Sequence, residues 1–390
     1  MDHTAQQALK TVGDKIAHGG RVTRDETIAL FGADLLELGR LAAIIKQRRW
    51  GRRAFFVVNR QINPSNICVL ACRFCDFATK RHRPNAYELS FDEISERSRG
   101  VREVHIVGGL HPEWPFEHYT MMLRRIKAGN PQVQIKAFTA VEIDFFARRA
   151  KRSVEDVLQT LKEAGLDALP GGGAEVFSER VRKALFPFKI GAPRWLEIHR
   201  AAHRLGIPTN STLLYGHMET IEERVDHLLK LRELQDDTGG LMSFIPLAYQ
   251  PGRTKVVARQ CSAIDDLRTI AIARLVLDNI PHIKAYWVTL GEATASVALS
   301  FGADDVDGTI GEERIMHAAD AEVPAQLTRT RLQEMIREAG CIPVERDALY
   351  NIVNAYADDS KEDQEQRAQE TEAAPFRPLP IASDPEPVTR

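Results

Sequence analysis

The chain has few cysteines, no long apolar run and almost no net charge. Its 390 residues include five cysteines, too few and too odd a number for a disulfide scaffold, which favours a reducing compartment. The formal charge of -2 gives no general attraction to nucleic acid or to an anionic membrane. No apolar run reaches the ~18 residues of a membrane span, and the first residues lack a signal-peptide pattern. We therefore expect a soluble, cytoplasmic protein that binds neither nucleic acid nor membrane.

The composition otherwise suits a large folded domain. The length allows roughly two or three average domains, or one large α/β barrel with extensions. Hydrophobic residues make up 44% of the chain, which is enough for a sizeable core. Residues 358–390 differ, because they hold nine acidic and four basic residues and five of the 19 prolines. This composition predicts a disordered tail.

Short apolar runs alternate with amphipathic helical patterns between residues 53 and 310. The expected strands are Phe55–Val58, Val104–Val107, Ile135–Phe138, Leu166–Leu169, Asn210–Leu214, Met242–Leu247, Ile283–Trp287 and Val297–Leu299. The expected helices are Phe91–Arg99, Phe116–Ala128, Val154–Ala164, Trp195–Leu205, Ile221–Leu234 and Ile264–Ile280. This alternation predicts repeated βα units around a parallel sheet. Eight such units predict an α/β fold with a full or partial (βα)8 TIM-type barrel.

Both ends of the barrel sequence are expected to carry helical extensions. Thr23 and Glu26 have the spacing of a capping box in the N-terminal part, residues 1–52. After the barrel, residues 53–310, a helical cap is expected over residues 311–357. Its predicted helices are Leu327–Ala339 and Ala348–Tyr356. The tail, 358–390, completes the predicted organisation.

Three of the five cysteines lie in one short stretch, Cys68-Val-Leu-Ala-Cys72-Arg-Phe-Cys75. The stretch follows the first expected strand, so in a parallel barrel it lies at the carboxyl ends of the strands, where active sites form. Clustered thiolates favour soft metals, iron–sulfur clusters above all. Structural zinc normally has four protein ligands, and neither Cys261 nor Cys341 comes with a paired spacing. The alternative, three unrelated core thiols, leaves the spacing unexplained.

The pattern C-x3-C-x2-C, with Phe74 before its last cysteine, resembles the signature of the radical S-adenosylmethionine (SAM) superfamily. The resemblance implies a 4Fe–4S cluster on Cys68, Cys72 and Cys75, whose open iron binds the methionine part of SAM. It implies Phe74 as a cofactor-binding residue and a radical SAM type of barrel. One-electron reduction of SAM would give methionine and a 5′-deoxyadenosyl radical, with a low-potential donor such as flavodoxin or ferredoxin as partner.

Further positions at the expected strand ends fit this family. Gly108 and Gly109 end the second strand, where the superfamily has a Gly-Gly motif that meets SAM through its backbone. Glu142, after the third strand, is expected to contact the ribose or the methionine; a solvated loop glutamate is the alternative. His111, beside the Gly-Gly motif, and His217, after the fifth strand, are candidate catalytic residues that could orient a carboxylate or transfer a proton.

Longer segments resemble the menaquinone, or futalosine-pathway, branch of the superfamily. This branch holds two futalosine-pathway enzymes and the related deazaflavin synthase subunits. The segments are Asn63–Cys68, Gly108–Pro112, Lys136–Ile143, Leu169–Phe177 and Asp304–Thr309. Lys136–Ile143 and the Ala-Glu-Val-Phe run at 174–177 most resemble the aminofutalosine-forming members. The resemblance covers about residues 53–307, fits the N-terminal helices less specifically and does not extend to the tail.

The resemblance implies an enzyme, a transferase of menaquinone biosynthesis with SAM as co-substrate. Its expected small-molecule substrate is the dicarboxylate 3-[(1-carboxyvinyl)oxy]benzoate, and its expected product is 6-amino-6-deoxyfutalosine, with one carboxylate lost as bicarbonate. Such chemistry needs a dry pocket and groups that hold two carboxylates, for which cations are expected. The basic run Lys80–Arg83 is a candidate, although charge runs usually lie on solvated faces.

Two alternatives remain at this point. Within the family, the chain could be a cyclic dehypoxanthine futalosine synthase, which abstracts hydrogen instead of adding the radical, or a deazaflavin (FO) synthase subunit. Outside it, the cysteines could serve a non-catalytic iron–sulfur or zinc-binding regulator.

Overall fold

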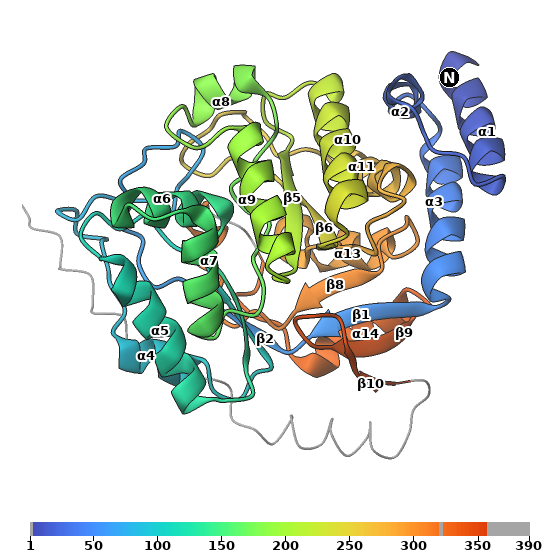
Figure 1. Cartoon of the computed structure of the whole chain (residues 1–390). Coiled ribbons are helices and arrows are strands. Elements are labelled where there is room, and N and C mark those ends of the chain that lie inside the picture. Colours follow the sequence, from blue (N-terminus) through green and yellow to red (C-terminus); the bar gives the residue numbers. More distant parts are fainter. Residues whose placement is uncertain (1–2, 320–322, 357–390) are drawn as a thin grey trace, which may run out of the picture. The chain divides into compact units, whose positions relative to one another are not determined.

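Parallel strands alternate with helices through most of the chain, and short extra elements follow at the C-terminal end (Figure 1). The computed structural model describes residues 3–319 and 323–356, and the statements below concern these residues. The strands are β1 (Arg53–Val57), β2 (Asn59–Ile62), β3 (Glu103–Ile106), β4 (Gln134–Ala137), β5 (Thr209–Tyr215), β6 (Leu241–Ala248), β7 (His282–Ile283), β8 (Asp305–Gly308), β9 (Ile342–Arg346) and β10 (Ile352–Ala355). These strands and the helices lie in one compact unit, Met1–Ala355.

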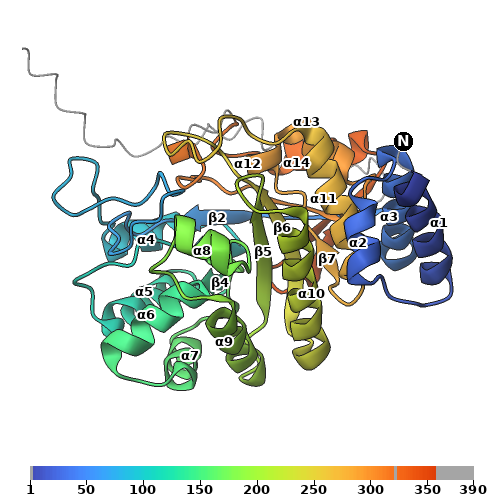
Figure 2. The ribbon, with the colours of Figure 1, turned by 90° about the horizontal axis from the view of Figure 1, so that it is seen from above.

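The helices connect and flank these strands. They are α1 (His3–Ala17), α2 (Arg24–Leu30), α3 (Leu35–Trp50), α4 (Phe91–Arg97), α5 (Phe116–Gly129), α6 (Ala140–Ala150), α7 (Val154–Glu163), α8 (Glu179–Leu185), α9 (Ala192–Arg204), α10 (Ile221–Thr238), α11 (Ala263–Val276), α12 (Trp287–Leu290), α13 (Glu292–Ala298) and α14 (Arg329–Glu338), with a short 3-10 turn at His317–Ala319. Figure 2 shows α4 to α10 on the outside of the strands. The predicted βα alternation is therefore present.

The strands close into a ring of eight positions. Parallel pairing runs from β8 to β1, from β2 through β3 to β4, and from β5 through β6 to β7. β1 and β2 are consecutive and together hold the first position. Single parallel bridges join Lys136 to Ala168, Leu169 to Thr209, and Lys284 to Asp305, so residues 168–169 hold the fourth position. The predicted (βα)8 barrel is thereby confirmed.

Sequence-local signals start several of the helices. Capping boxes, in which a Ser or Thr side chain and a Glu three residues later satisfy each other's backbone N–H groups, begin α2, α4, α6 and α10. The box at α2 is the one predicted from Thr23 and Glu26. In α7 the apolar residues at helical spacing, Val154, Val157, Leu158 and Leu161, are buried on one side of the helix.

Two predicted elements are wrong. Val297–Leu299, expected as the eighth strand, ends helix α13, and the eighth strand is β8, whose sequence Asp-Val-Asp-Gly is not an apolar run. Ala348–Tyr356, expected as a helix, contains β10, which pairs antiparallel with β9. β9 in turn pairs parallel with β1, from Arg53 opposite Ile342 to Val57 opposite Arg346, and it was not predicted. The predicted tail, 358–390, lies outside the described residues.

Charged side chains from several strands pair with one another inside the barrel, and we call this buried group the barrel floor. Lys136 Nζ lies 2.5 Å from Glu103 Oε1, Arg346 Nε lies 2.6 Å from Asp305 Oδ2, and Lys284 Nζ lies 3.2 Å from Asp307 Oδ2. All six residues, Glu103, Lys136, Lys284, Asp305, Asp307 and Arg346, are buried. Burial of charge is tolerated here because each acid has a basic partner.

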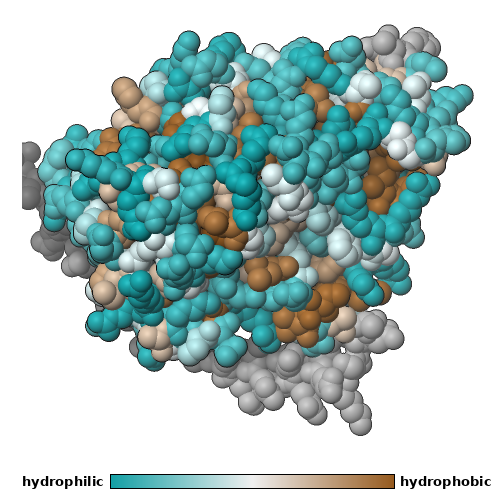
Figure 3. Space-filling model, in the orientation of Figure 1, coloured by the Kyte–Doolittle hydropathy of each residue, from teal (hydrophilic) through white to brown (hydrophobic). Residues whose placement is uncertain are grey.

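The outer surface is mainly hydrophilic on the face shown in Figure 3, where apolar residues form separate small patches. Among the described helices, none combines the length and apolar character of a membrane span.

Candidate functional site

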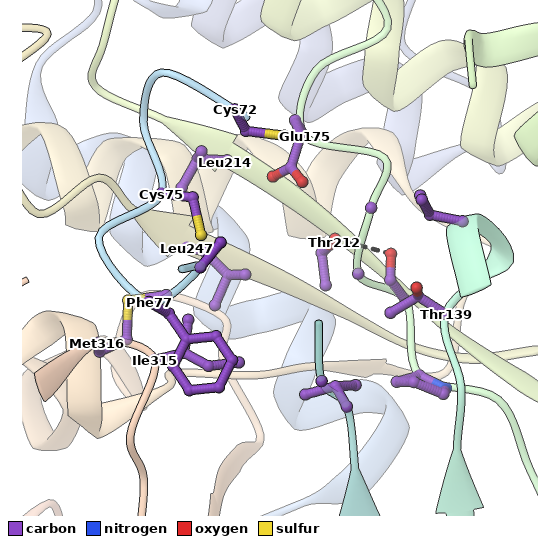
Figure 4. A pocket seen from close by; sticks show the side chains of 18 of the residues that line it. Cys72, Cys75, Phe77, Thr139, Glu175, Thr212, Leu214, Leu247, Ile315 and Met316 are labelled. Atoms are coloured by element: carbon purple, nitrogen blue, oxygen red, sulfur yellow. Dashed lines mark hydrogen bonds between the residues drawn. The ribbon is translucent and has the colours of Figure 1, made fainter. Parts of the chain in front are cut away.

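A cavity of about 280 Å³ opens at the carboxyl ends of the strands. Cys68, Cys72 and Cys75 line it, so the loop after β2 brings all three motif thiols to one space. Figure 4 shows Cys72 near Glu175, and Cys75 beside Phe77 and Leu247. The predicted positions Phe74, Gly108, Gly109 and Glu142 line the same cavity.

The loop that carries the cysteines, residues 63–78, is called the cluster loop below, and several contacts tie it down. The Cys68 N–H donates to Thr79 O at 3.0 Å, and the Leu110 N–H donates to Cys68 Sγ at 3.4 Å. On its other limb, the Arg73 N–H donates to Leu185 O, at the end of α8, at 2.7 Å. The Asp76 carboxylate accepts from the Arg253 N–H at 3.0 Å. The loop is thus fixed before any ligand binds.

The glycine pair after β3 allows the cluster loop to pack against the barrel. A Cβ on Gly109 would lie 2.2 Å from Ile67 O, and one on Gly108 would lie 3.1 Å from Ser65 O. The Gly109 N–H donates to Ser65 O at 2.9 Å. Both glycines also line the cavity. Their lack of side chains therefore leaves room for the cluster loop on one side and for a ligand in the cavity.

Glu142 is not on a loop, as the sequence suggested, but in the first turn of α6. Its Oε2 accepts from the Thr139 N–H at 2.7 Å, which completes a capping box, and its Oε1 accepts from the Gly108 N–H at 3.3 Å. Burial raises the pKa of this carboxyl to about 7. A solvated loop glutamate is therefore excluded, and the carboxyl group faces the cavity at the end of β3.

A second acid and a lysine lie on the cysteine side of the cavity. Lys189 forms an ion pair with Glu175, and both line the cavity. The Lys189 ammonium also lies 5.1 Å from the centre of the Phe74 ring, which meets Phe186 edge to face at 5.8 Å. Phe74 is thus held between a cation and a second ring. Neither Lys189 nor Glu175 was predicted as a site residue.

The deeper end of the cavity is polar and is built from strand side chains. His105 on β3, Asn59 on β2, Asp307 on β8 and Tyr286 after β7 line it. Asp307 accepts from Asn59 Nδ2 at 3.4 Å and from Lys284. His105 Nε2 has no hydrogen-bond partner among the described residues. Burial, together with the charge of Lys136, lowers the pKa of His105 to about 3, so the ring is neutral at pH 7.

The two histidines predicted as catalytic do not line this cavity. His111 stacks on Trp114, its Nδ1 accepts from the Glu113 and Trp114 N–H groups at 3.2 Å, and its Nε2 lies 3.2 Å from Glu88. His217 has a buried side chain, whose Nε2 bonds Leu214 O at 3.0 Å and whose Nδ1 accepts from the Met218 N–H at 2.7 Å. Both nitrogens of both rings are occupied by local partners. Their placement at strand ends was predicted correctly, but their direction was not.

The expected cationic clamps are also missing from the described lining. Lys189 is the one Lys or Arg side chain among the described residues that line the cavity, and it is already paired. The basic run Lys80–Arg83 lies outside the lining. Its first member, Lys80, instead donates to backbone carbonyls of the cluster loop.

The donor set at the cavity mouth fits an iron–sulfur cluster better than a closed zinc site. All five cysteines are free, and the other two lie elsewhere: Cys261 bonds Asp266 at 3.1 Å and Cys341 contacts Lys46 at 3.2 Å. The described residues include no group of three or more His, Cys, Asp or Glu side chains arranged to hold a single metal ion. A cluster is wider than one ion, so its thiolates stand further apart. Burial raises the pKa of Cys72 to about 11, a cost that cationic iron offsets when it displaces the proton.

Comparison of the sequence with known proteins points to one family. The family model for the radical SAM superfamily matches residues 62–231, and that for the CofH/MqnC C-terminal region matches residues 238–358. Aminodeoxyfutalosine synthase of Thermus thermophilus is 47% identical over 360 residues, 89% of this chain and 96% of that protein. Cyclic dehypoxanthine futalosine synthase of Streptomyces coelicolor is 36% identical over 375 residues, 93% of this chain and 94% of that protein.

Among solved structures, methylornithine synthase (PylB) matches with a TM-score of 0.68 at 19% identity, and the match covers 85% of this chain and 97% of that one. This likeness supports the fold alone. The chain belongs to the radical SAM superfamily of enzymes, whose members use a 4Fe–4S cluster and SAM. Within it, the chain falls in the futalosine-pathway branch of menaquinone biosynthesis.

Proposed function

We propose that the protein transfers the 5′-deoxyadenosyl group of SAM to 3-[(1-carboxyvinyl)oxy]benzoate, which gives 6-amino-6-deoxyfutalosine. Methionine is released, and one carboxylate leaves as bicarbonate. The observation that carries this proposal is the 47% identity to an aminodeoxyfutalosine synthase over nearly the whole of both chains. The 36% identity to a cyclic dehypoxanthine futalosine synthase, over a similar span, makes the cyclising reaction the weaker candidate.

Cys68, Cys72 and Cys75 would hold the 4Fe–4S cluster, which supplies the electron for cleavage of SAM and leaves one iron open for its methionine group. The three thiols share one loop and one cavity, and the remaining cysteines lie outside it, which supports this assignment. A low-potential flavodoxin or ferredoxin of the cytoplasm would donate the electron to the cluster. Five unpaired cysteines are compatible with such a reducing compartment.

SAM would lie between the cluster loop and the ends of β3 and β4. Gly108 and Gly109 leave their backbone accessible at this point, and Phe74 lies on the same side. Glu142 presents a buried carboxyl group there, and an ammonium or hydroxyl ligand would stabilise its ionised form. This chain's residues would thus bind and orient SAM and keep water from its reactive carbon.

The aryl substrate would occupy the deeper, polar end of the cavity. His105 and Tyr286 line this end, and the neutral ring of His105 has a nitrogen without a partner among the described residues. Because Lys189 is paired with Glu175, neutral donors would contribute much of the binding of the substrate's carboxylates. Such donors bind without moving a proton, which suits a radical reaction. We assign no catalytic role to His111 or His217, whose rings are held by local partners.

Anaerobic reconstitution with iron and sulfide tests the proposal. The protein is incubated with SAM, a low-potential reductant and 3-[(1-carboxyvinyl)oxy]benzoate, and the products are identified by mass spectrometry. We expect 6-amino-6-deoxyfutalosine and methionine in equal amounts. Parallel reactions with dehypoxanthine futalosine should give no cyclised product. Turnover of that second substrate with none of the first would replace the proposal by the cyclising reaction, and a colourless protein with one zinc per chain would exclude both.

A further inference from the structure

Lys80 binds three consecutive carbonyl groups of the cluster loop. Its Nζ donates to Cys68 O at 2.8 Å, to Val69 O at 3.0 Å and to Leu70 O at 3.1 Å. Among the described residues, no backbone N–H donates to these three oxygens. The positions of these carbonyls between β2 and the turn at Cys72 give them no strand or helix partner, and Cys68 is buried, so its carbonyl in particular needs a donor from the protein. Lys80 supplies all three.

The number and geometry of donors match this task. A lysine ammonium has three N–H groups on one atom, and each can point at a different carbonyl. An arginine carries its N–H groups in a flat fork, which suits carboxylates but does not converge on three successive carbonyls in the same way. The contact therefore uses a property of lysine beyond its charge.

The segment around Lys80 is itself fixed against the cluster loop. Thr79 accepts from the Cys68 N–H at 3.0 Å and donates its own N–H to Asn66 O at 2.9 Å. Its hydroxyl donates to Asn85 Oδ1 at 2.9 Å, and Asn66 Nδ2 donates to Asn85 O at 2.8 Å. Thr79 thus holds the chain immediately before Lys80, so the lysine stem starts from a defined position next to Cys68.

The neighbouring basic residues do not share this contact. Arg81 forms ion pairs with Glu88 and Glu113 and makes no contact with the three carbonyls among the hydrogen bonds of the described residues. Arg83 is exposed, and its backbone N–H donates to Lys80 O at 2.9 Å. Of the four residues Lys80–Arg83, Lys80 alone contacts the loop carbonyls in the described part of the chain. This difference provides a matched control within the same run.

We propose that Lys80 is a positioning residue for the cluster: it fixes the Cys68–Leu70 limb of the loop and places a positive charge beside it. The inference rests on the proposed 4Fe–4S cluster. Lys80 does not line the cavity, so it acts through the loop backbone. Its charge also favours the reduced, more negative state of the cluster, since the ammonium lies near the backbone of a ligand residue.

The test compares Lys80→Met, Lys80→Arg and the control Arg83→Met with the unaltered protein. After anaerobic reconstitution, iron and sulfide per chain, the rate of iron loss to a chelator and the reduction potential of the cluster are measured. Unfolding of the metal-free proteins in urea reports the fold. Contacts that support metal ligands typically change metal affinity about 10- to 100-fold. We expect Lys80→Met to lose iron about tenfold faster or more and to have a more negative potential.

The arginine variant separates the two parts of the proposal. Lys80→Arg keeps the charge, so the reduction potential of its cluster should stay near that of the unaltered protein. Its rate of iron loss should fall between the rates of the unaltered protein and Lys80→Met. Arg83→Met should match the unaltered protein in both measurements. Equal iron loss and equal potential in Lys80→Met and the unaltered protein would overturn the inference and leave the proposed cofactor intact. An unaltered protein that takes up no cluster would overturn both.

Discussion

The two ends of the barrel interior satisfy their buried polar groups in different ways. On the floor, acids and bases from distant strands form pairs with one another, as Lys136 does with Glu103 and Arg346 with Asp305. At the mouth, the three thiols and Glu142 face the cavity. Each floor acid has a basic partner within the chain, whereas the three thiols at the mouth have no such partner among the described residues. Substitutions on the floor should therefore change stability, and those at the mouth should change cluster and SAM binding.

The largest effect is expected at the mouth, from Cys72→Ser. Removing one of three thiolates should abolish cluster binding and turnover while the barrel stays folded, because Cys72 lies on the cluster loop and is not among the buried core residues. Iron and sulfide analysis, circular dichroism and product formation measure this. Cys341→Ser is the control, since Cys341 lies outside the cavity against Lys46 and should leave the cluster unchanged. Full activity of Cys72→Ser would contradict the assignment of the site.

On the floor, Lys136→Met should destabilise the fold without a specific effect on the cluster. The change leaves the Glu103 carboxylate buried with only the more distant Arg346, 3.7 Å away, as a partner. Breaking a buried pair costs about 3–5 kcal/mol. Urea unfolding measures the loss, and adding Glu103→Gln should recover part of it. If Lys136→Met unfolded at the same urea concentration as the unaltered protein, the floor would not be a stabilising ionic layer.

A smaller effect, on both stability and cluster retention, is expected from Gly109→Ala. Gly109 follows β3 and packs against the cluster loop. The new Cβ would lie 2.2 Å from Ile67 O, so the cluster loop must shift. We expect a loss of about 1–3 kcal/mol in stability and weaker cluster retention, measured by urea unfolding and iron release. Gly13→Ala is the matched control, because its Cβ would meet Leu41 at an ordinary 3.9 Å within helix α1. Unchanged iron release in Gly109→Ala would refute the close-packing argument.

The smallest effect is a pH dependence from Glu142. Its pKa is raised from 4.5 to about 7 in the folded chain. Between these two pH values the carboxyl group is therefore protonated in the folded state and ionised in the unfolded state. This contribution to stability is complete below pH 4.5 and is lost as the pH rises through 7. Glu142→Gln keeps a capping side chain but cannot titrate. Its stability relative to the unaltered, metal-free protein should therefore improve from pH 5 to pH 8; a constant difference would contradict the raised pKa.

The sequence predicted the mouth better than the floor, and the reason is locality. The three cysteines and the glycine pair are each readable within a few residues, whereas the capping box of Glu142 with Thr139 was not predicted. β8 was missed because it is not an apolar run: its Asp305 and Asp307 are buried against Arg346 and Lys284 from other parts of the chain. No local pattern reveals such partners before the ring is closed.

Side-chain direction limited the prediction of single site residues. His111 and His217 follow strand ends as expected, but the Trp114 ring and the His217 loop carbonyls turn them away from the cavity. Lys189 enters the site from the segment after α8, which carries no motif. His105 could have been found, because it lies two residues before Val107, which comes just after β3, and residues two apart on an extended strand share a face.

The central claim is that the mouth holds a cluster with an iron open to SAM. Electron paramagnetic resonance of the anaerobically reconstituted, reduced protein tests it most directly, with spectra recorded before and after addition of SAM. We expect the signal of a reduced 4Fe–4S cluster, a clear change of that signal when SAM is added, and no signal in Cys72→Ser. A signal that SAM leaves unchanged, or one that persists without Cys72, would contradict it.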